Sequence, residues 1–252
     1  MSKFFISIVS HGHEDLLVNN AELIKISKIN NVHVVIKDNL KVERLACYCD
    51  FNGLDYLVDE HELGFGENNN SVFEYCFKLG MSDNDWFLII NPDVFIDKLE
   101  FLTLMGKLGS SKFKLHTIDL YKDVQYLIPD NSLRYFPKWS SLLNMLINKP
   151  VTNVYDKNSL SEWSQVEWAS GAFLIFKVEL FRALSGFDKK YFMYYEDVDI
   201  CYRANVEQSE KVSFIKTVRA QHYGAFKNRK VFSQHFRWYF SSLLKFLIGR
   251  RY

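Results

Sequence analysis

The stretch Trp86-Phe87-Leu88-Ile89-Ile90-Asn91-Pro92-Asp93 decides the fold class of this chain. Five consecutive apolar residues bounded by turn residues are typical of a strand that is buried on both faces, as in a parallel sheet. Because Asn, Pro and Asp favour turns, we expect the strand to end at Ile90. Ligands of parallel α/β sheets bind beyond the carboxyl ends of the strands, which is where Asp93 would lie.

Short apolar runs of the same kind recur upstream and alternate with segments of helical spacing. Strands are predicted over 4–10, 32–36 and 54–58, and helices over 14–27 and 71–79. Strands that alternate with helices argue for right-handed crossovers and a parallel sheet. The fold class is therefore predicted to be α/β, with a Rossmann-like, mostly parallel central sheet flanked by helices.

The second half of the chain carries weaker patterns of the same type. It contains no repeat and no linker that would split the chain. The elements expected there are strands over 115–120, 124–128, 166–176, 212–215 and 218–222, and helices over 139–147, 178–185 and 196–206.

The net charge of +1 hides a strong asymmetry along the chain. Ten of the 31 Lys and Arg residues follow Glu210 without a single acid, which leaves 21 basic against 30 acidic residues upstream. A basic tail suggests an anionic partner such as nucleic acid, lipid headgroups or a phosphate ligand. The acidic body argues against nucleic acid. Four cysteines without metal or disulfide spacing indicate a reducing compartment.

The tripeptide Asn91-Pro92-Asp93 has two interpretations. It is a strand-ending turn by composition. Alternatively, Asp93 is an oxygen ligand for Mg²⁺ or Mn²⁺ bridging a diphosphate, since such metals take few protein carboxylates and complete their shell with water and phosphate oxygens. His222, on a late strand, is a candidate second ligand, although a lone His is more often structural.

Three carboxylates, Glu196, Asp197 and Asp199, follow the aromatic stretch 192–195. The helix dipole favours acids at a helix N-terminus, which explains one or two of them. A carboxylate held against aromatic side chains has a raised pKa and can act as a general base near neutral pH. Arg203 is expected to reach the same cleft and offset anionic charge.

The segment Leu63-Gly64-Phe65-Gly66-Glu67-Asn68-Asn69-Asn70 superficially suggests a phosphate-binding loop, but it matches neither glycine-rich nucleotide motif. Its glycines allow the backbone to approach a ligand, and its Asn side chains either cap the next helix or bind sugar hydroxyls. His11 and His13 are expected to form the first strand-to-helix loop, in preference to a metal site.

Taken together and in order, these segments resemble the bacterial family 2 glycosyltransferases, which have the GT-A fold. The resemblance runs from the first strand to about residue 240. It is greatest to the O-antigen rhamnosyltransferases, which transfer L-rhamnose from dTDP-β-L-rhamnose to N-acetylglucosaminyl-diphospho-undecaprenol. The segments that carry it are Ile8-Val9-Ser10-His11-Gly12-His13, Lys37-Asp38-Asn39, Gly64-Phe65-Gly66-Glu67-Asn68-Asn69, Asn91-Pro92-Asp93, Ala169-Ser170-Gly171-Ala172, Gly186-Phe187-Asp188 and Tyr195-Glu196-Asp197-Val198-Asp199.

The resemblance implies an inverting transfer. An acceptor hydroxyl attacks the anomeric carbon, Asp197 takes its proton with Glu196 beside it, and dTDP departs. Asp93 matches the last carboxylate of the family's metal-binding D-x-D, and Asn91 departs from that pattern at the first acid. The implied metal is Mg²⁺ or Mn²⁺, held by Asp93 and His222, and it would stabilise the leaving diphosphate.

The resemblance also implies the contacts of donor and acceptor. Asp38 would recognise the pyrimidine, and Gly171 and Ala172 would lie under the acceptor sugar. The implied donor-binding residues are Ser10, His11, Asp38, Asn39, Gly66, Asn68, Asn69, Asn91, Asp93 and Arg203. UDP-galactofuranose or another dTDP-deoxysugar is an alternative donor. A glycoside hydrolase and a non-catalytic, membrane-associated sugar-nucleotide-binding protein are alternatives from other classes.

The basic tail carries an apolar stripe at 232, 236, 239, 240, 243, 244 and 247, on one helical face. With its basic residues, this stripe predicts an interfacial helix that docks on an anionic membrane. A helix packed on the domain shows the same stripe, so that alternative stays open. We therefore expect a peripheral protein on the cytoplasmic face of the bacterial inner membrane. Its catalytic domain would span 1–226, with a nucleotide-binding half of about 1–95 and an acceptor-binding half of about 96–226, and its tail 227–252.

Overall fold

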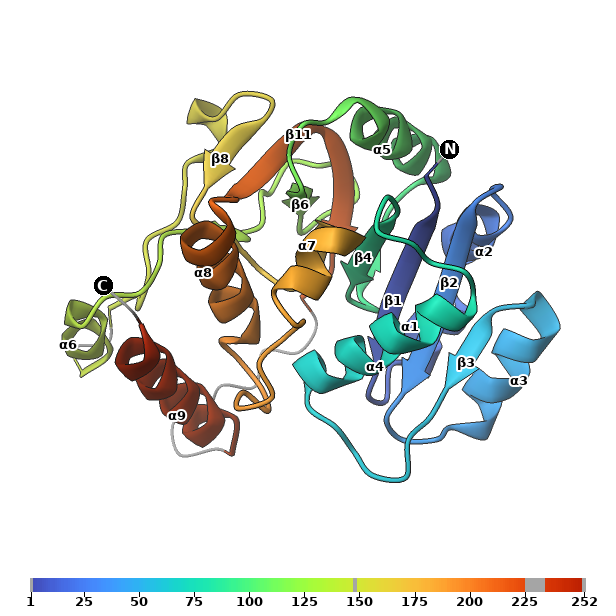
Figure 1. The fold of residues 1–252 in the computed structure, drawn as a ribbon, viewed down its shortest axis with the longest axis horizontal. Helices are drawn as coiled ribbons and strands as arrows, with labels where there is room; N and C mark the ends of the chain where they lie inside the picture. Colours follow the sequence, from blue (N-terminus) through green and yellow to red (C-terminus); the bar gives the residue numbers. More distant parts are fainter. Residues whose placement is uncertain (1, 147–148, 225–233, 251–252) are drawn as a thin grey trace.

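The computed structural model describes residues 2–146, 149–224 and 234–250. Within them lies a nine-stranded mixed sheet in the order β3-β2-β1-β4-β10-β6-β11-β5, with β8 also paired to β11, and helices pack on both of its faces (Figure 1). The main-sheet strands are β1 (Phe4–Ser10), β2 (Val32–Asp38), β3 (Asp55–Leu57), β4 (Trp86–Ile90), β5 (Val94–Phe95), β6 (Leu115–Tyr121), β8 (Ser164–Val166), β10 (Phe173–Lys177) and β11 (Val212–His222), and a small second sheet pairs β7 (Leu133–Arg134) with β9 (Trp168–Ala169).

The helices alternate with the strands in the first half, as predicted. They are α1 (Glu14–Val18), α2 (Ala21–Ser27), α3 (Glu43–Asn52), α4 (Phe65–Lys78), α5 (Lys98–Ser110), α6 (Ser140–Leu146), α7 (Val178–Ala183), α8 (Glu196–Gln208) and α9 (Gln234–Gly249), with a short 3₁₀ helix at Lys157–Ser159.

The predicted parallel order holds for the first four strands, β3, β2, β1 and β4. The second half is mixed, because β10 runs antiparallel to both β4 and β6. The turn that leads into β10 lies at the carboxyl end of β4, where Phe173 pairs with Ile90. A strand that enters the sheet there can only run back along β4, and no helical crossover is needed.

The central strand β4 explains the two cores of the molecule. Phe87 and Ile89 point to one face and pack with Phe73 of α4, whereas Trp86 and Leu88 belong to the core on the opposite face. All five residues of β4 are buried, which is why the strand reads as an unbroken apolar run. Each side chain of this size contributes about 1.5–3 kcal/mol by leaving water.

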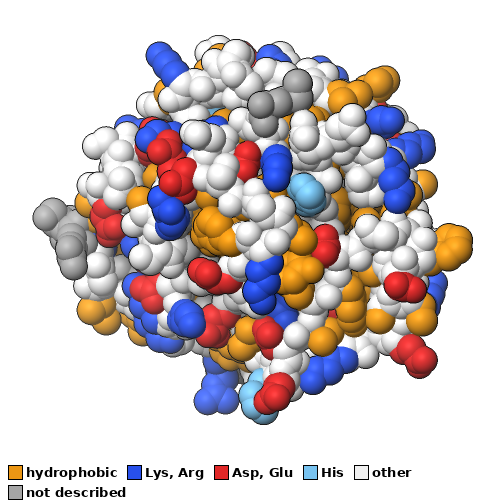
Figure 2. Space-filling view, turned by 45° about the vertical axis from the view of Figure 1, so that its right-hand side comes forward, with side chains coloured by type: hydrophobic (Ala, Val, Ile, Leu, Met, Phe, Trp, Pro, Cys, Tyr) orange, Lys and Arg blue, Asp and Glu red, His pale blue; other side chains and the backbone are white. Residues whose placement is uncertain are grey.

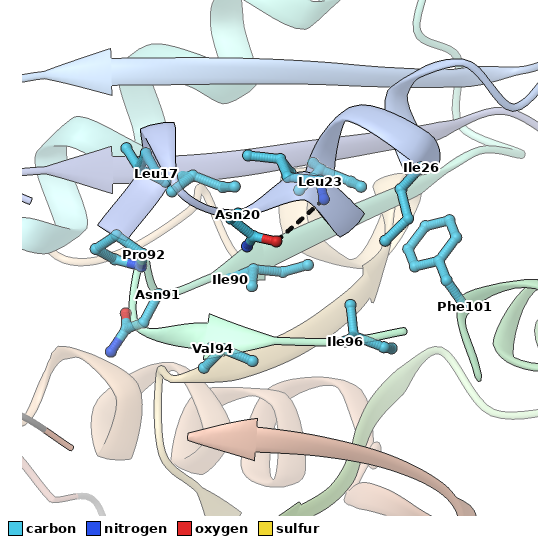
Figure 3. A pocket seen from close by; sticks show the side chains of 12 residues that line it. Leu17, Asn20, Leu23, Ile26, Ile90, Asn91, Pro92, Val94, Ile96 and Phe101 are labelled. Atoms are coloured by element: carbon cyan, nitrogen blue, oxygen red, sulfur yellow. Dashed lines mark hydrogen bonds between the residues drawn. The ribbon is translucent and has the colours of Figure 1, made fainter. Parts of the chain in front are cut away.

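The helices α1 and α2 cover β1 and β4 on one face and enclose a small apolar cavity of about 10 Å³ (Figure 3). Asn20 caps α2 by accepting a hydrogen bond from the Leu23 backbone N–H, 3.1 Å away. Pro92 lines this cavity, and the Asn91 amide points away from it (Figure 3). The apolar packing therefore anchors the turn that carries Asp93.

Several predicted elements have different limits. The strand expected at 124–128 is a turn, because the Asp123 carboxylate accepts hydrogen bonds from the Leu127 and Ile128 backbones and Tyr126 adopts a φ of 56°. The strands expected at 212–215 and 218–222 form one strand, β11, whose register with β6 shifts between Ile215 and Arg219. The helix expected over 14–27 is two helices, α1 and α2.

The described part of the predicted tail, α9, packs on the domain. Leu243 and Leu247 of the predicted stripe are buried, and Phe246 lies against the rings of Tyr195 and Tyr202. The Ser242 hydroxyl donates a hydrogen bond to the Met193 carbonyl, 3.0 Å away. Half of the stripe thus serves the core, while Phe240 stays exposed. Position 232 of the stripe and the flanking Lys227, Arg229, Lys230 and Arg251 lie outside the described residues.

Candidate active site

The carboxyl end of β4 and the N-terminus of α8 are joined by hydrogen bonds. The Asn91 N–H donates to the Ala172 carbonyl, 2.9 Å away, and the Gly171 N–H donates to Asp197 Oδ2, 3.0 Å away. The turn 170–172 therefore sits between the predicted metal side and the predicted base. A Cβ on Gly171 would lie 3.1 Å from the Phe65 ring, so this position admits little more than glycine.

The N-terminus of α8 orients the two acids. Tyr194 and Tyr195 precede it with φ angles of 68° and 70°, a left-handed conformation that costs of order 1–3 kcal/mol per residue. Strain of this kind persists only where the surroundings enforce it. Here Tyr195 is buried and donates to the Tyr239 hydroxyl of α9. The turn leaves Asp197 half-buried and Glu196 only 6% exposed.

Burial and hydrogen bonding affect the pKa values of Glu196 and Asp197 to different extents. Burial, reinforced by the charge of Asp197, raises the pKa of Glu196 well above its ordinary value. Glu196 Oε2 is buried and has no hydrogen-bond partner among the described residues. Burial also raises the pKa of Asp197, but hydrogen bonds from the Gly171 and Val198 backbones favour its ionised form. Burial therefore favours the protonated form of Glu196 more strongly, and Asp197 is the better candidate to accept a proton.

Asp93 and His222 meet at the other side of the turn. The antiparallel pairing of β5 with β11 sets His222 opposite Val94, and His222 Nε2 lies 3.5 Å from Asp93 Oδ1. Burial alone would raise the pKa of Asp93, but His222 outweighs it and the pKa is lowered. Burial would lower the pKa of His222, yet Asp130 and Asp93 together raise it to about 9.

This pair fits a divalent cation in its donor chemistry. Carboxylate oxygen and imidazole nitrogen are both ligands of Mn²⁺-type metals, with bonds of about 2.0–2.2 Å. Two atoms 3.5 Å apart can therefore ligate one ion. In the described part of the chain, no group of three or more His, Cys, Asp or Glu side chains is arranged to hold a metal. Asp93 and His222 would thus leave most of the coordination shell to phosphate oxygens and water.

Asp38, predicted to recognise a pyrimidine, is engaged by groups of the protein itself. It is fully buried, its Oδ1 accepts from the Leu40 N–H, and its Oδ2 accepts from the Val42 N–H and the Tyr56 hydroxyl. No oxygen of Asp38 is accessible to a pyrimidine in this structure. Ser10 is also fully buried, and its hydroxyl accepts a hydrogen bond from the His13 N–H.

The Asn residues predicted to bind the donor are buried as well. Helix α4 begins at Phe65, six residues before the predicted start, so Asn68 and Asn69 lie inside it. Asn68 donates to the Leu63 and Gly64 carbonyls, and Asn69 accepts from the Ser7 hydroxyl. A Cβ on Gly66 would lie 2.8 Å from Phe187 Cβ, which identifies Gly66 as a packing glycine.

Arg203 does not line the cleft. Its Nε donates to Asp199 Oδ2 at 2.7 Å, and its terminal nitrogens donate to the Leu184 and Gly186 carbonyls. It therefore fastens the end of α7 to α8. Asp199 is likewise engaged within the protein, because it accepts hydrogen bonds from Arg203 and from the Tyr191 hydroxyl.

Of the predicted donor set, His11 is exposed, and Asn39, Asn91 and Arg203 are partly exposed. The Asn39 amide donates to the Leu63 carbonyl, 2.8 Å away. The contacts of His11, Asn39 and Asn91 with a donor stay predictions. Sequence reasoning missed Asp130, whose Oδ2 lies 2.6 Å from His222 Nδ1. Asp130 stands 92 residues before His222, and no sequence spacing links the two.

Two curated relatives cover most of this chain. Rhamnosyltransferase WbbL from Escherichia coli (strain K12) is 31% identical over 250 residues, which is 98% of this chain and 93% of the relative. The chain belongs to the family 2 glycosyltransferases. A second relative is the low-salt glycan biosynthesis hexosyltransferase Agl10 from Haloferax volcanii. It is 24% identical over 72% of this glycosyltransferase, which spans 56% of that relative. No family model matches the sequence.

Solved structures identify the fold of the glycosyltransferase as GT-A. GalNAc-T7, solved with UDP, GalNAc and Mn²⁺, superimposes with a TM-score of 0.70 at 15% identity over 97% of this chain, which spans about half (48%) of that one. The mannosyltransferase PcManGT from Pyrobaculum calidifontis, solved with GDP-Man and Mn²⁺, gives a TM-score of 0.63 at 11% identity, covering 99% of this chain and 65% of its own.

The surface of the glycosyltransferase mixes charges more evenly than the sequence does. On the face seen in Figure 2, basic and acidic side chains are interspersed with hydrophobic patches. Some basic residues after Glu210 have structural contacts: Lys216 donates to the Leu160 carbonyl, and Arg250 packs over the rings of Phe136 and Tyr202. Among the described helices, none combines the length and apolarity needed to cross a membrane.

Proposed function

We propose that this glycosyltransferase transfers L-rhamnose from dTDP-β-L-rhamnose to a lipid-linked acceptor, N-acetylglucosaminyl-diphospho-undecaprenol, with inversion to the α-anomer. The observation that carries the proposal is the 31% identity to a rhamnosyltransferase along nearly the full length of both chains. The arrangement of Asp197 and Asp93 on two sides of the turn 170–172 supports the same chemistry.

In the proposed reaction, Asp197 accepts the proton of the attacking acceptor hydroxyl. The N–H groups of Gly171 and Val198 hold its carboxylate in a fixed orientation, which is a requirement of general-base catalysis. The raised pKa of Glu196 disfavours a second negative charge beside Asp197. The acceptor hydroxyl would approach Asp197 beside the turn 170–172.

Asp93 and His222 would hold Mg²⁺ or Mn²⁺ beside the donor diphosphate. A divalent cation supplies Lewis-acid stabilisation of the negative charge that develops on the leaving dTDP. The Asn91 amide, half-buried and directed away from the apolar pocket, lies next to this pair along the chain. It takes the place of the first acid of a D-x-D, so the protein contributes less negative charge to the metal.

Incubation with a panel of nucleotide sugars tests the donor. The purified protein is given dTDP-rhamnose, UDP-galactofuranose or another dTDP-deoxysugar, with a lipid-diphosphate-GlcNAc acceptor and Mn²⁺. We expect product only from dTDP-rhamnose, identified by mass, and an α-linkage by NMR. A product from UDP-galactofuranose alone would replace the proposed donor, and a β-linked product would contradict inversion.

We also propose that the face around α9 contacts an anionic membrane. Phe240 and Ile248 of α9 are exposed, the latter by 73%, and Trp139 and Phe192 nearby are exposed as well. Aromatic residues and basic side chains such as Arg237 favour the headgroup region. These exposed side chains take the place of Leu243 and Leu247 of the predicted stripe, which are buried against the domain.

Vesicle flotation tests this contact. The double variant Phe240→Ser/Ile248→Ser should float less with anionic vesicles than the wild-type chain, because it loses buried apolar area without losing charge. Leu99→Ser is the matched control, since Leu99 is 72% exposed on α5. Truncation before α9 is unsuitable, because it would uncover Leu243 and Phe246. Equal flotation of all three proteins would exclude α9 from membrane binding.

A further inference from the structure

The Asp130 carboxylate is fixed on both of its oxygens. Its Oδ1 accepts a hydrogen bond from the Asn131 N–H at 2.7 Å, and its Oδ2 lies 2.6 Å from His222 Nδ1. The side chain of Asp130 is largely buried, with 17% of its surface exposed. A buried carboxylate held in this way has a single orientation, so its contact with His222 is a fixed feature of the fold.

The chain takes an extended detour to bring Asp130 to this place. After β6, the turn closed by Asp123 reverses the chain, and Tyr121 then forms a bridge with Pro129. The Asp130 N–H donates to the Leu120 carbonyl, 2.9 Å away. Because β6 pairs with β11 in parallel, with Gln221 opposite Tyr121, this return places Asp130 beside His222.

A buried lysine also holds the end of β6 in place. Lys157 is 7% exposed, and its ammonium group donates to the Leu120 carbonyl and pairs with Asp119 Oδ1 at 2.9 Å. Leu120 O thus accepts from both Lys157 and Asp130. These contacts hold the end of β6 and, through Leu120, the position of Asp130.

The contact with Asp130 determines which nitrogen of His222 faces the site. A carboxylate accepts hydrogen bonds, so Nδ1 of His222 must carry the proton that is shared with Asp130. Nε2 lies on the side of Asp93, at 3.5 Å, and it ligates a cation only after giving up any proton of its own. Metal-ligating histidines commonly donate their other ring N–H to a carboxylate, which fixes the ring and makes the ligating nitrogen more basic.

We propose that Asp130 is a positioning residue that orients His222 as a ligand, through Nε2, of a divalent cation shared with Asp93. The inference rests on the proposed function, because that function supplies the metal. It adds a residue that does not touch the metal, the donor or the acceptor, and that acts through His222.

Mn²⁺ binding tests the inference without an activity assay. Mn²⁺ is titrated into the full chain in the presence of dTDP, and free Mn²⁺ is measured by electron paramagnetic resonance. Asp130→Ala should weaken Mn²⁺ binding by about 10–100-fold, the usual effect of losing such a carboxylate partner. Asp130→Asn keeps a hydrogen-bond acceptor of the same shape, so its Mn²⁺ affinity should fall between those of the wild-type chain and Asp130→Ala.

Asp50→Asn is the matched control, because it removes an exposed carboxylate from α3 and leaves the loop 121–130 unchanged. It should bind Mn²⁺ as the wild-type chain does. Spin-echo modulation from a coordinated imidazole nitrogen should be present in the wild-type chain and in Asp50→Asn, and weaker in Asp130→Ala. Thermal unfolding of each variant shows whether it is folded. If Asp130→Ala does not fold, the comparison is made with Asp130→Asn.

The outcomes separate the inference from the function on which it rests. Wild-type Mn²⁺ affinity and nitrogen coupling in both Asp130 variants would overturn the inference and leave the metal site intact. Absence of Mn²⁺ binding by the wild-type chain would overturn the metal part of the proposed function and the inference with it. Equal weakening in Asp50→Asn would assign the effect to the loss of one negative charge and also overturn the role of Asp130.

Discussion

Replacing Asp197 with asparagine should lower kcat by about 10²–10⁴-fold, the range expected when a general base is removed. Asn has the same shape and keeps an oxygen for the Val198 N–H, so the fold should persist. The amide cannot take the proton of the acceptor hydroxyl. The measurement is the initial rate at saturating dTDP-rhamnose and lipid acceptor. The affinity for dTDP, determined by calorimetry, should stay close to that of the wild-type chain.

Glu196→Gln is the matched control for this experiment. Glu196 lies next to Asp197, but burial raises its pKa well above the ordinary value, which favours the protonated form that cannot act as a base. A glutamine should therefore change kcat little. Near-wild-type turnover in Asp197→Asn, together with a large loss in Glu196→Gln, would move the base to Glu196. Asp199 is a poor substitute, since Arg203 and Tyr191 already occupy its oxygens.

The pH dependence of the rate follows from the same environment. The pKa of Asp197 is raised, chiefly by burial, and the base works only when ionised. The rate of the wild-type enzyme should therefore fall as the pH drops through this raised pKa, at a higher pH than for an ordinary aspartate. The residual rate of Asp197→Asn should lack this acidic limb. An identical limb in both proteins would assign it to another group.

The sequence predicts the first half of the fold well, because each element there is encoded locally. The strand 86–90 is apolar on both faces, and it ends at residues that favour turns, as the structure confirms. The start of α4 was less visible. Gly64 and Gly66 suggest a loop, yet a Cβ on Gly66 would strike Phe187, a contact 121 positions away that only the folded chain reveals.

The second half and the metal side depend on such distant contacts. Val124–Ile128 has the residue types of a strand, but the Asp123 carboxylate closes it into a turn. That turn is what returns Asp130 to His222. Likewise, Asp38 and Arg203 have the chemistry of ligand-binding residues, and their backbone and carboxylate partners become apparent only in three dimensions. Motifs therefore suggested Asp197 and Asp93 as candidates, whereas their partners had to come from the structure.

Replacing Asp93 with alanine should lower kcat/KM by roughly 10²–10³-fold and abolish stimulation by Mn²⁺, since Lewis-acid stabilisation is worth several kcal/mol and each 1.36 kcal/mol is about tenfold in rate. Asp93 is buried at the end of β4, where its carboxylate faces His222. The measurement is the rate against Mn²⁺ concentration after removal of metal with EDTA. Asp50→Ala, which removes an exposed carboxylate from α3, controls for the loss of one charge.

A double variant decides whether Asp93 and His222 act on the same ion. If both ligate one cation, either single alanine substitution weakens it, and the double variant should lose far less than the product of the two single losses, because residues that act as a unit are non-additive. Multiplicative losses would mean that the two side chains act separately. Full wild-type activity after exhaustive EDTA treatment would exclude a metal altogether, and the 3.5 Å contact of Asp93 with His222 would then be an ion pair that stabilises the β5–β11 corner.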